Sequence, residues 1–355
     1  MRTYIPAKDI PIIINISGDE IRAFLSSAGS EDFRGEAKSA VAFYHQDPDL
    51  YSDRALVEFG KNIQTAINHP VRIEVRHAKG IGAAQVVAKG IWGAAARQAA
   101  IKGIRRSLLK ADKNIEVRMA GTSSFEFNVR GVNKSCAIKF LRQAWPKVLE
   151  QMNYQPGHYI DSQKTATIIA ADGDGTIYDG PKAGQPLPTM AKSLAREALT
   201  AWLEAGGVFM LNSGNELSRN VLRVKDGLPG NLLNRILVSG NGGADLVCFD
   251  AQGNAVPVQG YSEAALDVAT SKHKLDIVYI GDDGSEDGND WRGFVEAGFD
   301  RAVLVAKDFK PSYDARLRTG YVGHLVRGTK IYLEIALLKA KISHGKPFLS
   351  AWAVS

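Results

Sequence analysis

Short apolar runs alternate with longer segments of mixed polarity from about residue 160 onward, and the two kinds of segment read as strands and helices. The expected strands are 165–171, 207–212, 235–239, 275–280 and 301–306. The expected helices are 189–205, 215–224, 262–270, 289–297 and 327–342. A hairpin is expected over LVCFDAQGNAVPV, which follows the third strand. This alternation predicts an α/β fold built on a doubly wound parallel sheet.

Residues 1–150 follow a different pattern, in which apolar strand segments cluster around a long helix. The expected ranges are 71–77, 83–90, 114–121 and 124–131 for the strands and about 91–110 and 134–152 for the helices. This order is typical of an α+β domain with antiparallel strands and a covering helix. The stretch 155–164 reads as a linker, so we expect two domains, 1–155 and 156–355.

Composition places the chain among globular proteins. It has 355 residues, of which 45% are hydrophobic and 23% are charged. No run reaches 18 apolar residues, and the first residues lack the pattern of a secretory signal. The two cysteines, Cys136 and Cys248, lie in apolar segments without the spacing of a metal site. We therefore expect reduced thiols, a cytoplasmic location and no membrane partner.

Charge is divided unevenly along the chain. Residues 1–160 carry 23 Lys and Arg against 15 Asp and Glu, a net charge of +8. Residues 161–355 carry 21 against 23, a net charge of −2. A basic half suits an anionic partner, either a phosphorylated substrate or a nucleic acid, although a solvated basic face gives the same count.

The segment TATIIAADGDGTIYDG, residues 165–180, carries the strongest chemical signal. Its apolar run ends at Asp172, which is followed by Asp174 two residues later and then by Gly175 and Thr176. Two carboxylates this close together are costly unless a cation or a phosphoryl group neutralises them. The carboxyl end of a strand is also where open α/β sheets bind ligands. One carboxylate could attack phosphorus while its neighbour transfers the proton.

Two more polar segments follow later strands of the same expected sheet. LNSGN, residues 211–215, leads into a helix whose N-terminal N–H groups suit a phosphate oxygen, with Ser213 adding a hydrogen bond. A plain helix N-cap is the competing role for Ser213. GDDGSED, residues 281–287, is a dense acidic turn. Like charges packed this closely raise one another's pKa unless a divalent cation compensates them, and Mg²⁺ fits that need.

Together the three segments resemble the phosphatases of the haloacid dehalogenase superfamily. The resemblance covers about residues 165–310, with DGDGT first, LNSGN next and IGDDGSEDGND last. It implies a Rossmann-like core, a Mg²⁺ cofactor and an aspartyl-phosphate intermediate, with Asp172 as the nucleophile. Asp174 would be the general acid for the leaving oxygen and then the base for water. An aspartate at this second position is typical of the phosphotransfer members.

The resemblance also implies the remaining binding groups. The implied metal ligands are Asp172, the backbone carbonyl of Asp174, Asp282 and Asp283. The implied phosphate-binding residues are Thr176, Ser213, Gly214 and a lysine. The family usually has an acid four residues after the first aspartate of the acidic turn, which is Glu286 in this chain. Glu286 or Asp287 would therefore support the metal site.

The position of the lysine is the main departure from the family. Sugar phosphatases of the superfamily carry a cap domain after the second segment and the lysine after the cap, and this chain has no room for a cap there. Residues 124–143, SFEFNVRGVNKSCAIKFLRQ, resemble a cap exit with Lys134 in the lysine position, although Ser135 stands where glycine is usual. We therefore expect a permuted chain, which is tolerated because termini often lie close together. The alternatives are that Lys272 or Lys274 serves the site, or that Lys134 is an ordinary surface lysine.

Residues 1–155 would then hold an α+β cap-like domain and the lysine-bearing helix, and residues 156–355 the catalytic core. A cap closes over the site, excludes water and selects the substrate. Candidate substrate contacts, each of which also reads as an ordinary surface charge, are Arg76, His77, Arg118, Arg130, Glu286 and Asp287. The acidic turn and this form of cap most resemble trehalose-phosphate phosphatase and related sugar phosphatases.

These features predict a Mg²⁺-dependent phosphomonoesterase acting on a small phosphorylated metabolite, with a sugar phosphate favoured. A nucleotidase or a sugar phosphomutase of the same superfamily is the nearest alternative. The alternative of another class is a non-catalytic nucleic-acid-binding protein that uses the basic N-terminal half. That half lacks the interleaved aromatic residues of single-strand binders and shows no helix-turn-helix or zinc spacing, so nucleic acid is the less favoured partner.

Overall fold

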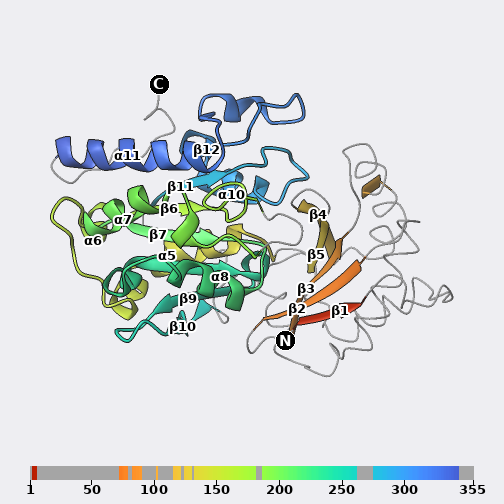
Figure 1. Cartoon of the computed structure of the whole chain (residues 1–355), viewed down its shortest axis with the longest axis horizontal. Coiled ribbons are helices and arrows are strands. Elements are labelled where there is room, and N and C mark those ends of the chain that lie inside the picture. Colours follow the sequence, from red (N-terminus) through yellow and green to blue (C-terminus); the bar gives the residue numbers. More distant parts are fainter. Residues whose placement is uncertain are drawn as a thin grey trace. The chain divides into compact units, whose positions relative to one another are not determined.

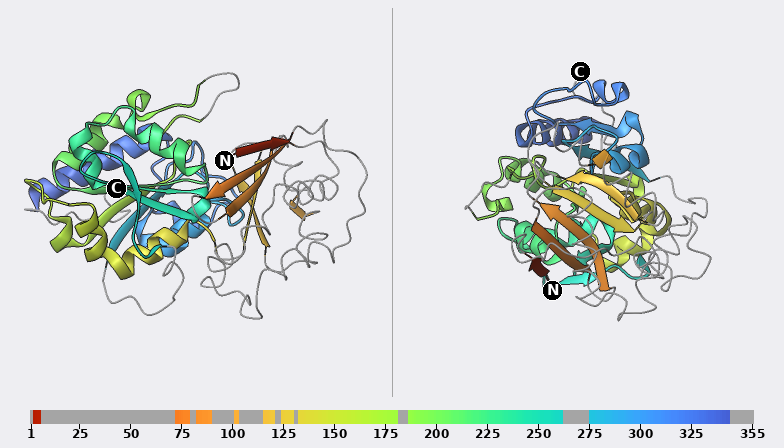
Figure 2. Two further views of the ribbon diagram at one scale, coloured as in Figure 1. Left: turned by 90° about the horizontal axis from the view of Figure 1, so that it is seen from below. Right: turned by 90° about the vertical axis from the view of Figure 1, so that its right-hand side faces the viewer.

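The structure is a computed structural model, shown in Figures 1 and 2. It describes residues 2–5, 72–78, 82–89, 101–102, 115–120, 124–129, 132–180, 186–261 and 275–343. The chain divides into two compact units: unit 1 is residues 1–133 with 262–267, and unit 2 is residues 134–261 with 268–355. Each unit is considered by itself.

Unit 1 contains a five-stranded antiparallel sheet with the strand order β1-β2-β3-β5-β4, coloured red to yellow-orange in Figures 1 and 2. The strands are β1 (Arg2–Ile5), β2 (Arg72–Ala78), β3 (Gly82–Lys89), β4 (Ile115–Ala120) and β5 (Ser124–Val129). The four expected strands and their antiparallel pairing are confirmed, whereas β1 was not expected. The helix expected near 91–110 lies outside the described residues except for Ile101 and Lys102, which are helical.

Unit 2 is built on a seven-stranded sheet with the order β10-β9-β8-β7-β6-β11-β12. Its strands are β6 (Thr167–Ala171), β7 (Val208–Asn212), β8 (Ile236–Gly240), β9 (Asp245–Phe249), β10 (Ala255–Pro257), β11 (Asp276–Gly281) and β12 (Ala302–Leu304). The strands from β8 across β6 to β12 are parallel, and β9 and β10 form the expected antiparallel hairpin. The α/β class is confirmed, and the sheet is mixed because the hairpin extends one edge of it.

The order of the parallel strands creates a topological switch point between β6 and β11, where the chain connections leave two adjacent strands in opposite directions. The first strand of this sheet, β6, lies in its middle; the chain then adds β7 to β10 on one side of β6 and returns to add β11 and β12 on the other (Figure 1). Open α/β sheets bind ligands at such a switch point, outside the carboxyl ends of the strands. Asp172 and Asp282 directly follow β6 and β11, so the topology puts both at the edge favoured for a ligand.

Helices cover both faces of this sheet. They are α5 (Ser135–Gln151), α6 (Ser162–Thr165), α7 (Arg196–Glu204), α8 (Leu217–Lys225), α10 (Trp291–Ala297) and α11 (Val326–Ile342). α7 packs against α11, and both share a buried core with Val278 and Ile280 of β11. Tyr279, between those two residues, points to the other face, where its ring packs edge-on to Phe294 of α10 and α10 packs against α5. Strands buried on both faces in this way are typical of doubly wound sheets.

The observed boundaries differ from the expected ones in two places. A 3₁₀ turn, Met190–Lys192, precedes α7, and the extended backbone of Ser193 separates the two, so the helix begins later than residue 189. The boundary between the units lies after Asn133 rather than near residue 155, because α5 packs with α10 on the sheet of unit 2. The helix expected at 262–270 lies outside the described residues.

Two expectations from composition concern thiols and membranes. Cys136 and Cys248 are both buried and form no disulfide, as expected for core thiols. Within the part of the chain that the structure describes, no helix is long and apolar enough to cross a bilayer.

Candidate active site

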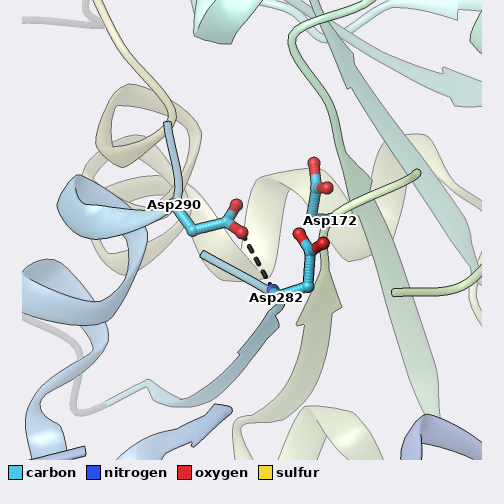
Figure 3. A group of neighbouring side chains, drawn as sticks. All are labelled: Asp172, Asp282 and Asp290. Atoms are coloured by element: carbon cyan, nitrogen blue, oxygen red, sulfur yellow. Dashed lines mark hydrogen bonds between the residues drawn. The ribbon is translucent and has the colours of Figure 1, made fainter. Parts of the chain in front are cut away.

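Three aspartates converge at the switch point of the sheet. β6 and β11 are hydrogen-bonded neighbours, and the backbone N–H of Asp172 continues their pairing by donating to the carbonyl of Ile280 at 2.9 Å. Asp172 and Asp282 therefore leave the sheet side by side. Each offers a carboxylate oxygen that lies, together with one from Asp290, in a group whose members are all within 4.8 Å of one another (Figure 3). The acid cluster is defined as Asp172, Asp282 and Asp290.

A glycine allows the DGDGT loop to approach this cluster. Gly175 has φ +85°, in the left-handed region, and a Cβ at that position would collide with Oδ2 of Asp282. The loop is closed by backbone hydrogen bonds, with Gly175 N–H donating to Tyr178 at 2.8 Å and Tyr178 N–H donating to Gly173 at 2.9 Å. The second glycine of DGDGT thus brings the loop after β6 against the carboxylate that follows β11.

Lys134 enters the acid cluster from the N-terminus of α5. Its Nζ donates to Oδ1 of Asp172 at 2.5 Å and to Oδ1 of Asp290 at 2.7 Å, and the lysine is buried. Its backbone is fixed as well, because Nδ2 of Asn212, at the end of β7, donates to the carbonyl of Lys134 at 2.8 Å. Lys134 thus lies next to Asp172, and binding of a phosphoryl group by this lysine remains a prediction. Lys272 and Lys274 lie outside the described residues.

Asp290 is a site residue that the sequence analysis missed. Its Oδ1 accepts hydrogen bonds from Lys134 at 2.7 Å and from the hydroxyl of Tyr279 at 3.0 Å. Its Oδ2 accepts from the backbone N–H groups of Asp282 at 3.0 Å and Asp283 at 3.2 Å. Four donors occupy both oxygens, so Asp290 is suited to orienting the lysine and the acidic turn rather than to holding a metal. Its position directly before an apolar helix was the available signal.

Burial and mutual repulsion shift the ionisation of the cluster. Burial raises the pKa of Asp172 to about 7, with Lys134 opposing the rise and the charge of Asp290 adding to it. Burial, followed by the charges of Asp290 and Asp172, raises the pKa of Asp282 well above its ordinary value. Burial alone would lower the pKa of Lys134, but the two neighbouring carboxylates raise it overall. One lysine therefore does not offset the negative charge gathered at this point.

A hard divalent cation would neutralise the negative charge of the acid cluster that Lys134 leaves uncompensated. Asp172 and Asp282 supply carboxylate oxygens from two adjacent strand ends, which is the donor type that Mg²⁺ prefers. A bound cation would favour the ionised form of both acids and so remove the cost of burying them. Asp282 and Asp172 are the residues that would hold it. The carbonyl of Asp174 as a third ligand remains a prediction.

Asp174 is held away from the acid cluster by two side chains. Its Oδ2 accepts from Nδ2 of Asn215 at 2.8 Å, and its Oδ1 accepts from Nη2 of Arg223 at 2.5 Å. Asn215 follows β7 and Arg223 lies in the last turn of α8. The sequence analysis gave neither residue a role. The carboxylate expected to transfer the proton is therefore anchored to the next strand and helix, not to Lys134.

Ser213 and Thr176 border the same loop. A Cβ on Gly173 would lie 3.2 Å from Oγ of Ser213, so this hydroxyl adjoins the loop that carries Asp172. Oγ of Ser213 also accepts from the backbone N–H of Asn215 at 3.2 Å, and Gly214 lies between them in the chain. Thr176 is fully buried, and its carbonyl accepts from Oγ1 of Thr329 on α11 at 2.7 Å. Thr176 therefore ties the loop to α11, and phosphate binding by these residues remains a prediction.

The structure puts Asp283 in the acidic turn rather than in the acid cluster. Its Oδ1 accepts from the N–H of Ser285 at 3.1 Å and from Oγ of Ser285 at 2.6 Å. Glu286 is exposed, and Asp287 is half-buried. These contacts give Asp283 a part in shaping the turn, and its proposed role as a metal ligand stays a prediction.

The candidate substrate contacts of the N-terminal half lie in unit 1. Arg76 and His77 are on β2, at a register shift in the pairing of β2 with β3. Arg118 is buried on β4, opposite Glu126 of β5, which is buried as well. Arg130 lies outside the described residues. Substrate contact by these side chains remains a prediction.

Comparison with known proteins gives no relative from which a function could be transferred. No family model, no curated protein and no solved structure matches the chain. The function is therefore inferred from the residues gathered at the carboxyl ends of β6, β7 and β11.

Proposed function

We propose that this protein is a Mg²⁺-dependent phosphomonoesterase of the haloacid dehalogenase type, which acts through an aspartyl-phosphate on a small phosphorylated metabolite. One observation carries the proposal: a buried lysine bonded to the first aspartate of DGDGT, beside a second aspartate from the adjacent strand end. A carboxylate nucleophile, a cation-binding carboxylate and a fixed ammonium group are what in-line phosphoryl transfer requires. All three come from different elements and meet at the switch point.

The first chemical step transfers the phosphoryl group to Asp172. A carboxylate oxygen of Asp172 forms a bond to phosphorus while the bond between phosphorus and the ester oxygen breaks. Asp174 gives its proton to that departing oxygen, which leaves as an alcohol, and Asp174 becomes a carboxylate. Lys134, at 2.5 Å from Asp172, favours the ionised form of the nucleophile and lies where it could neutralise phosphoryl oxygens.

The second step releases phosphate and restores the enzyme. Asp174, now ionised, takes a proton from water as the water oxygen bonds to phosphorus and the bond to Asp172 breaks. Inorganic phosphate leaves, Asp172 is again a carboxylate and Asp174 again carries a proton. A bound Mg²⁺ supplies Lewis-acid neutralisation of the phosphoryl oxygens, and Asp172 and Asp282 would hold it.

The role of Asp290 follows from its four donors. It fixes Nζ of Lys134 on one side and the backbone at residues 282 and 283 on the other. It thereby sets the distance between the lysine and Asp282 without contributing a ligand of its own. We assign it as a positioning residue for the lysine and the acidic turn.

The order of the segments along the chain supports a permuted member of the superfamily. Lys134 and its helix precede the nucleophile strand, whereas the superfamily places its lysine after the second segment. We assign unit 1 as the part that selects the substrate, and the net charge of +8 in residues 1–160 favours an anionic one. A sugar phosphate is the favoured class, and the cytoplasm is the expected location.

The test is hydrolysis of a panel of sugar phosphates, nucleotides and other phosphate esters with Mg²⁺ present, scored by released phosphate. We expect turnover by the wild type and loss of at least about 10⁴-fold in Asp172→Asn, because the amide cannot attack phosphorus. Asp308→Asn, at an exposed position after β12, is the matched control and should keep full activity. Near-normal turnover by Asp172→Asn would falsify the assignment.

The same panel distinguishes the alternatives within the superfamily. Phosphate released from nucleotides but not from sugar phosphates would identify a nucleotidase. Transfer between two positions of a sugar, in place of phosphate release, would identify a phosphomutase. No turnover of any ester, together with salt-dependent binding of DNA or RNA, would favour the non-catalytic alternative.

A further inference from the structure

Among the described residues, Arg223 forms an ion pair with Asp174, the expected general acid. Its Nη2 lies 2.5 Å from Oδ1 of Asp174, and Asn215 bonds the other oxygen of the same carboxylate at 2.8 Å. Both oxygens of Asp174 are therefore fixed by donors from the segment that follows β7. The orientation of this carboxylate is set by two side chains far from it in sequence.

The guanidinium of Arg223 is itself held rigidly. Its Nε donates to the carbonyl of Pro188 at 2.7 Å, and its Cζ stacks over the ring of Tyr178 at 3.9 Å from the centroid. Tyr178 is fully buried and belongs to the closed loop that begins at Asp172. A planar group fixed by a hydrogen bond on its edge and a ring on its face presents Nη2 to Asp174 in one direction.

Burial separates the roles of the two charged groups. Arg223 is buried, with a side chain 3% exposed, whereas the side chain of Asp174 is 26% exposed. An arginine with so little exposed surface is poorly placed to bind substrate phosphate directly. Asp174 keeps one open side through which a leaving oxygen and, later, a water molecule can approach. The route by which Arg223 can affect the chemistry is therefore its ion pair with the more exposed Asp174.

We propose that Arg223 is a positioning residue that, with Asn215, sets the orientation from which Asp174 delivers its proton to the leaving oxygen. The inference rests on the proposed function, since it presumes that Asp174 is the general acid. It goes beyond that function because it gives Arg223 of α8 a role in protonation of the leaving oxygen and not in binding of the phosphoryl group. The pair also keeps Asp174 out of the acid cluster, where a fourth carboxylate would compete for the lysine and the cation.

The inference predicts a dependence on the leaving group. An aryl ester such as p-nitrophenyl phosphate expels a stable anion and needs little help from an acid, whereas an alkyl ester such as glycerol phosphate expels an oxygen that must be protonated. Loss of the correct orientation should therefore harm alkyl esters selectively. A general loss of folding or of phosphoryl binding would harm both kinds of ester alike.

The experiment compares Arg223→Met and Arg223→Lys with the wild type on both esters, by kcat/KM with Mg²⁺. We expect Arg223→Met to lose about 10- to 100-fold on the alkyl ester and no more than about 3-fold on the aryl ester, with Arg223→Lys between them. Asn215→Ala should show the same selectivity with a smaller loss, and it serves if Arg223→Met does not fold. Folding of each variant is checked by thermal unfolding.

A double-mutant cycle completes the test. If Arg223 acts through Asp174, adding Arg223→Met to Asp174→Asn should cause no further loss on the alkyl ester. Equal losses on both esters, or a full additional loss in the double variant, would overturn the inference. These outcomes are distinct from failure of the proposed function, in which the wild type hydrolyses neither ester.

Discussion

Asp172 and Asp174 are two residues apart in one loop, yet the structure holds them in opposite ways. The side chain of Asp172 is 7% exposed and bonds to a buried lysine, while the side chain of Asp174 is 26% exposed and bonds to Asn215 and Arg223. The first belongs to a cluster fixed by buried charges and backbone groups. The carboxylate of the second is bonded, among the described residues, by the side chains of Asn215 and Arg223, and it borders solvent.

This contrast matches the different demands of the two steps. A nucleophile must keep one distance from phosphorus, so a rigid, buried setting favours it. A group that protonates an alcohol and then deprotonates water must serve two oxygens in succession. The partial exposure of Asp174, and its bonds to the side chains of Asn215 and Arg223, suit this second role. If this contrast is correct, substitutions around Asp172 and substitutions around Asp174 should change stability and activity to different extents.

The largest loss of stability and activity is expected when Asp172 loses its buried lysine partner. Lys134→Met leaves Asp172 and Asp290 buried without their cation, which should cost about 3–5 kcal/mol of unfolding free energy. Hydrolysis of phosphate esters should fall by at least about 10³-fold, because the nucleophile loses its ammonium partner. Urea unfolding and phosphate release measure the two quantities.

The matched control for that variant is Lys139→Met on the same helix. The side chain of Lys139 is 43% exposed, and its Nζ lies 4.0 Å from Glu296, so its removal should change stability by no more than about 0.5 kcal/mol. Equal effects of the two substitutions would show that the buried lysine has no special part in the fold or the chemistry.

The next largest loss of activity is expected from substitution of Asp174, the more exposed of the two aspartates. Asp174→Asn should lower kcat/KM for alkyl phosphates by about 10²- to 10⁴-fold, because the amide cannot give up a proton. Its unfolding free energy should fall by about 1–3 kcal/mol, less than in Lys134→Met, because the buried Arg223 loses its counter-charge while the amide oxygen can still accept its hydrogen bond. Asp179→Asn, exposed in the same segment, should leave both quantities unchanged. A loss of stability as large as that of Lys134→Met would remove the contrast.

A smaller effect is expected from the cation. Mg²⁺ at about 100 times its Kd should raise the unfolding free energy by about 2.7 kcal/mol if it binds only the folded protein. Asp282→Asn should abolish this gain and Asp174→Asn should keep most of it, because only the former removes a cluster carboxylate. Urea titrations with and without Mg²⁺ provide the comparison. An unchanged gain in Asp282→Asn would place the cation elsewhere.

The smallest effect concerns the support beneath the loop. Thr329→Val removes the donor to the carbonyl of Thr176 while keeping the side-chain shape, so it should cost about 0.5–1.5 kcal/mol of unfolding free energy. Both esters should lose activity equally, because the whole loop carrying Asp172 and Asp174 loosens. A loss confined to alkyl esters would mean that α11 controls the acid alone.

Much of unit 2 could be predicted because its strands are short, mostly apolar and often flanked by glycine or aspartate. β6, β7 and β11 begin within two residues of their expected positions, and Asp172 and Asp282 lie close together, as expected for residues that follow two strands of one sheet. Lys134 was found through its sequence context rather than its spacing, since 38 residues separate it from Asp172. β1, with four residues, is too short for a period to mark it.

Asp290 and Arg223 could not be found in the same way. Asp290 lies eight residues beyond Asp282, across an irregular turn whose path no hydrophobic period determines. Arg223 lies in a helix where an arginine ordinarily points to solvent, and contacts with Asp174, Tyr178 and Pro188 hold it in a buried position. Both act through contacts between segments that the sequence pattern does not connect.

The close approach at Gly175 has a consequence for how this protein tolerates variation. A Cβ there would meet Asp282, and a Cβ at Gly281 would lie 2.7 Å from Cγ of Asp290. Neither glycine donates, accepts or ionises through a side chain, yet alanine at either would push apart the carboxylates that face them. In a saturation library selected for turnover, Gly175 and Gly281 should be as invariant as the aspartates, so the positions that tolerate no substitution would report the close packing around the acid cluster as well as its chemistry.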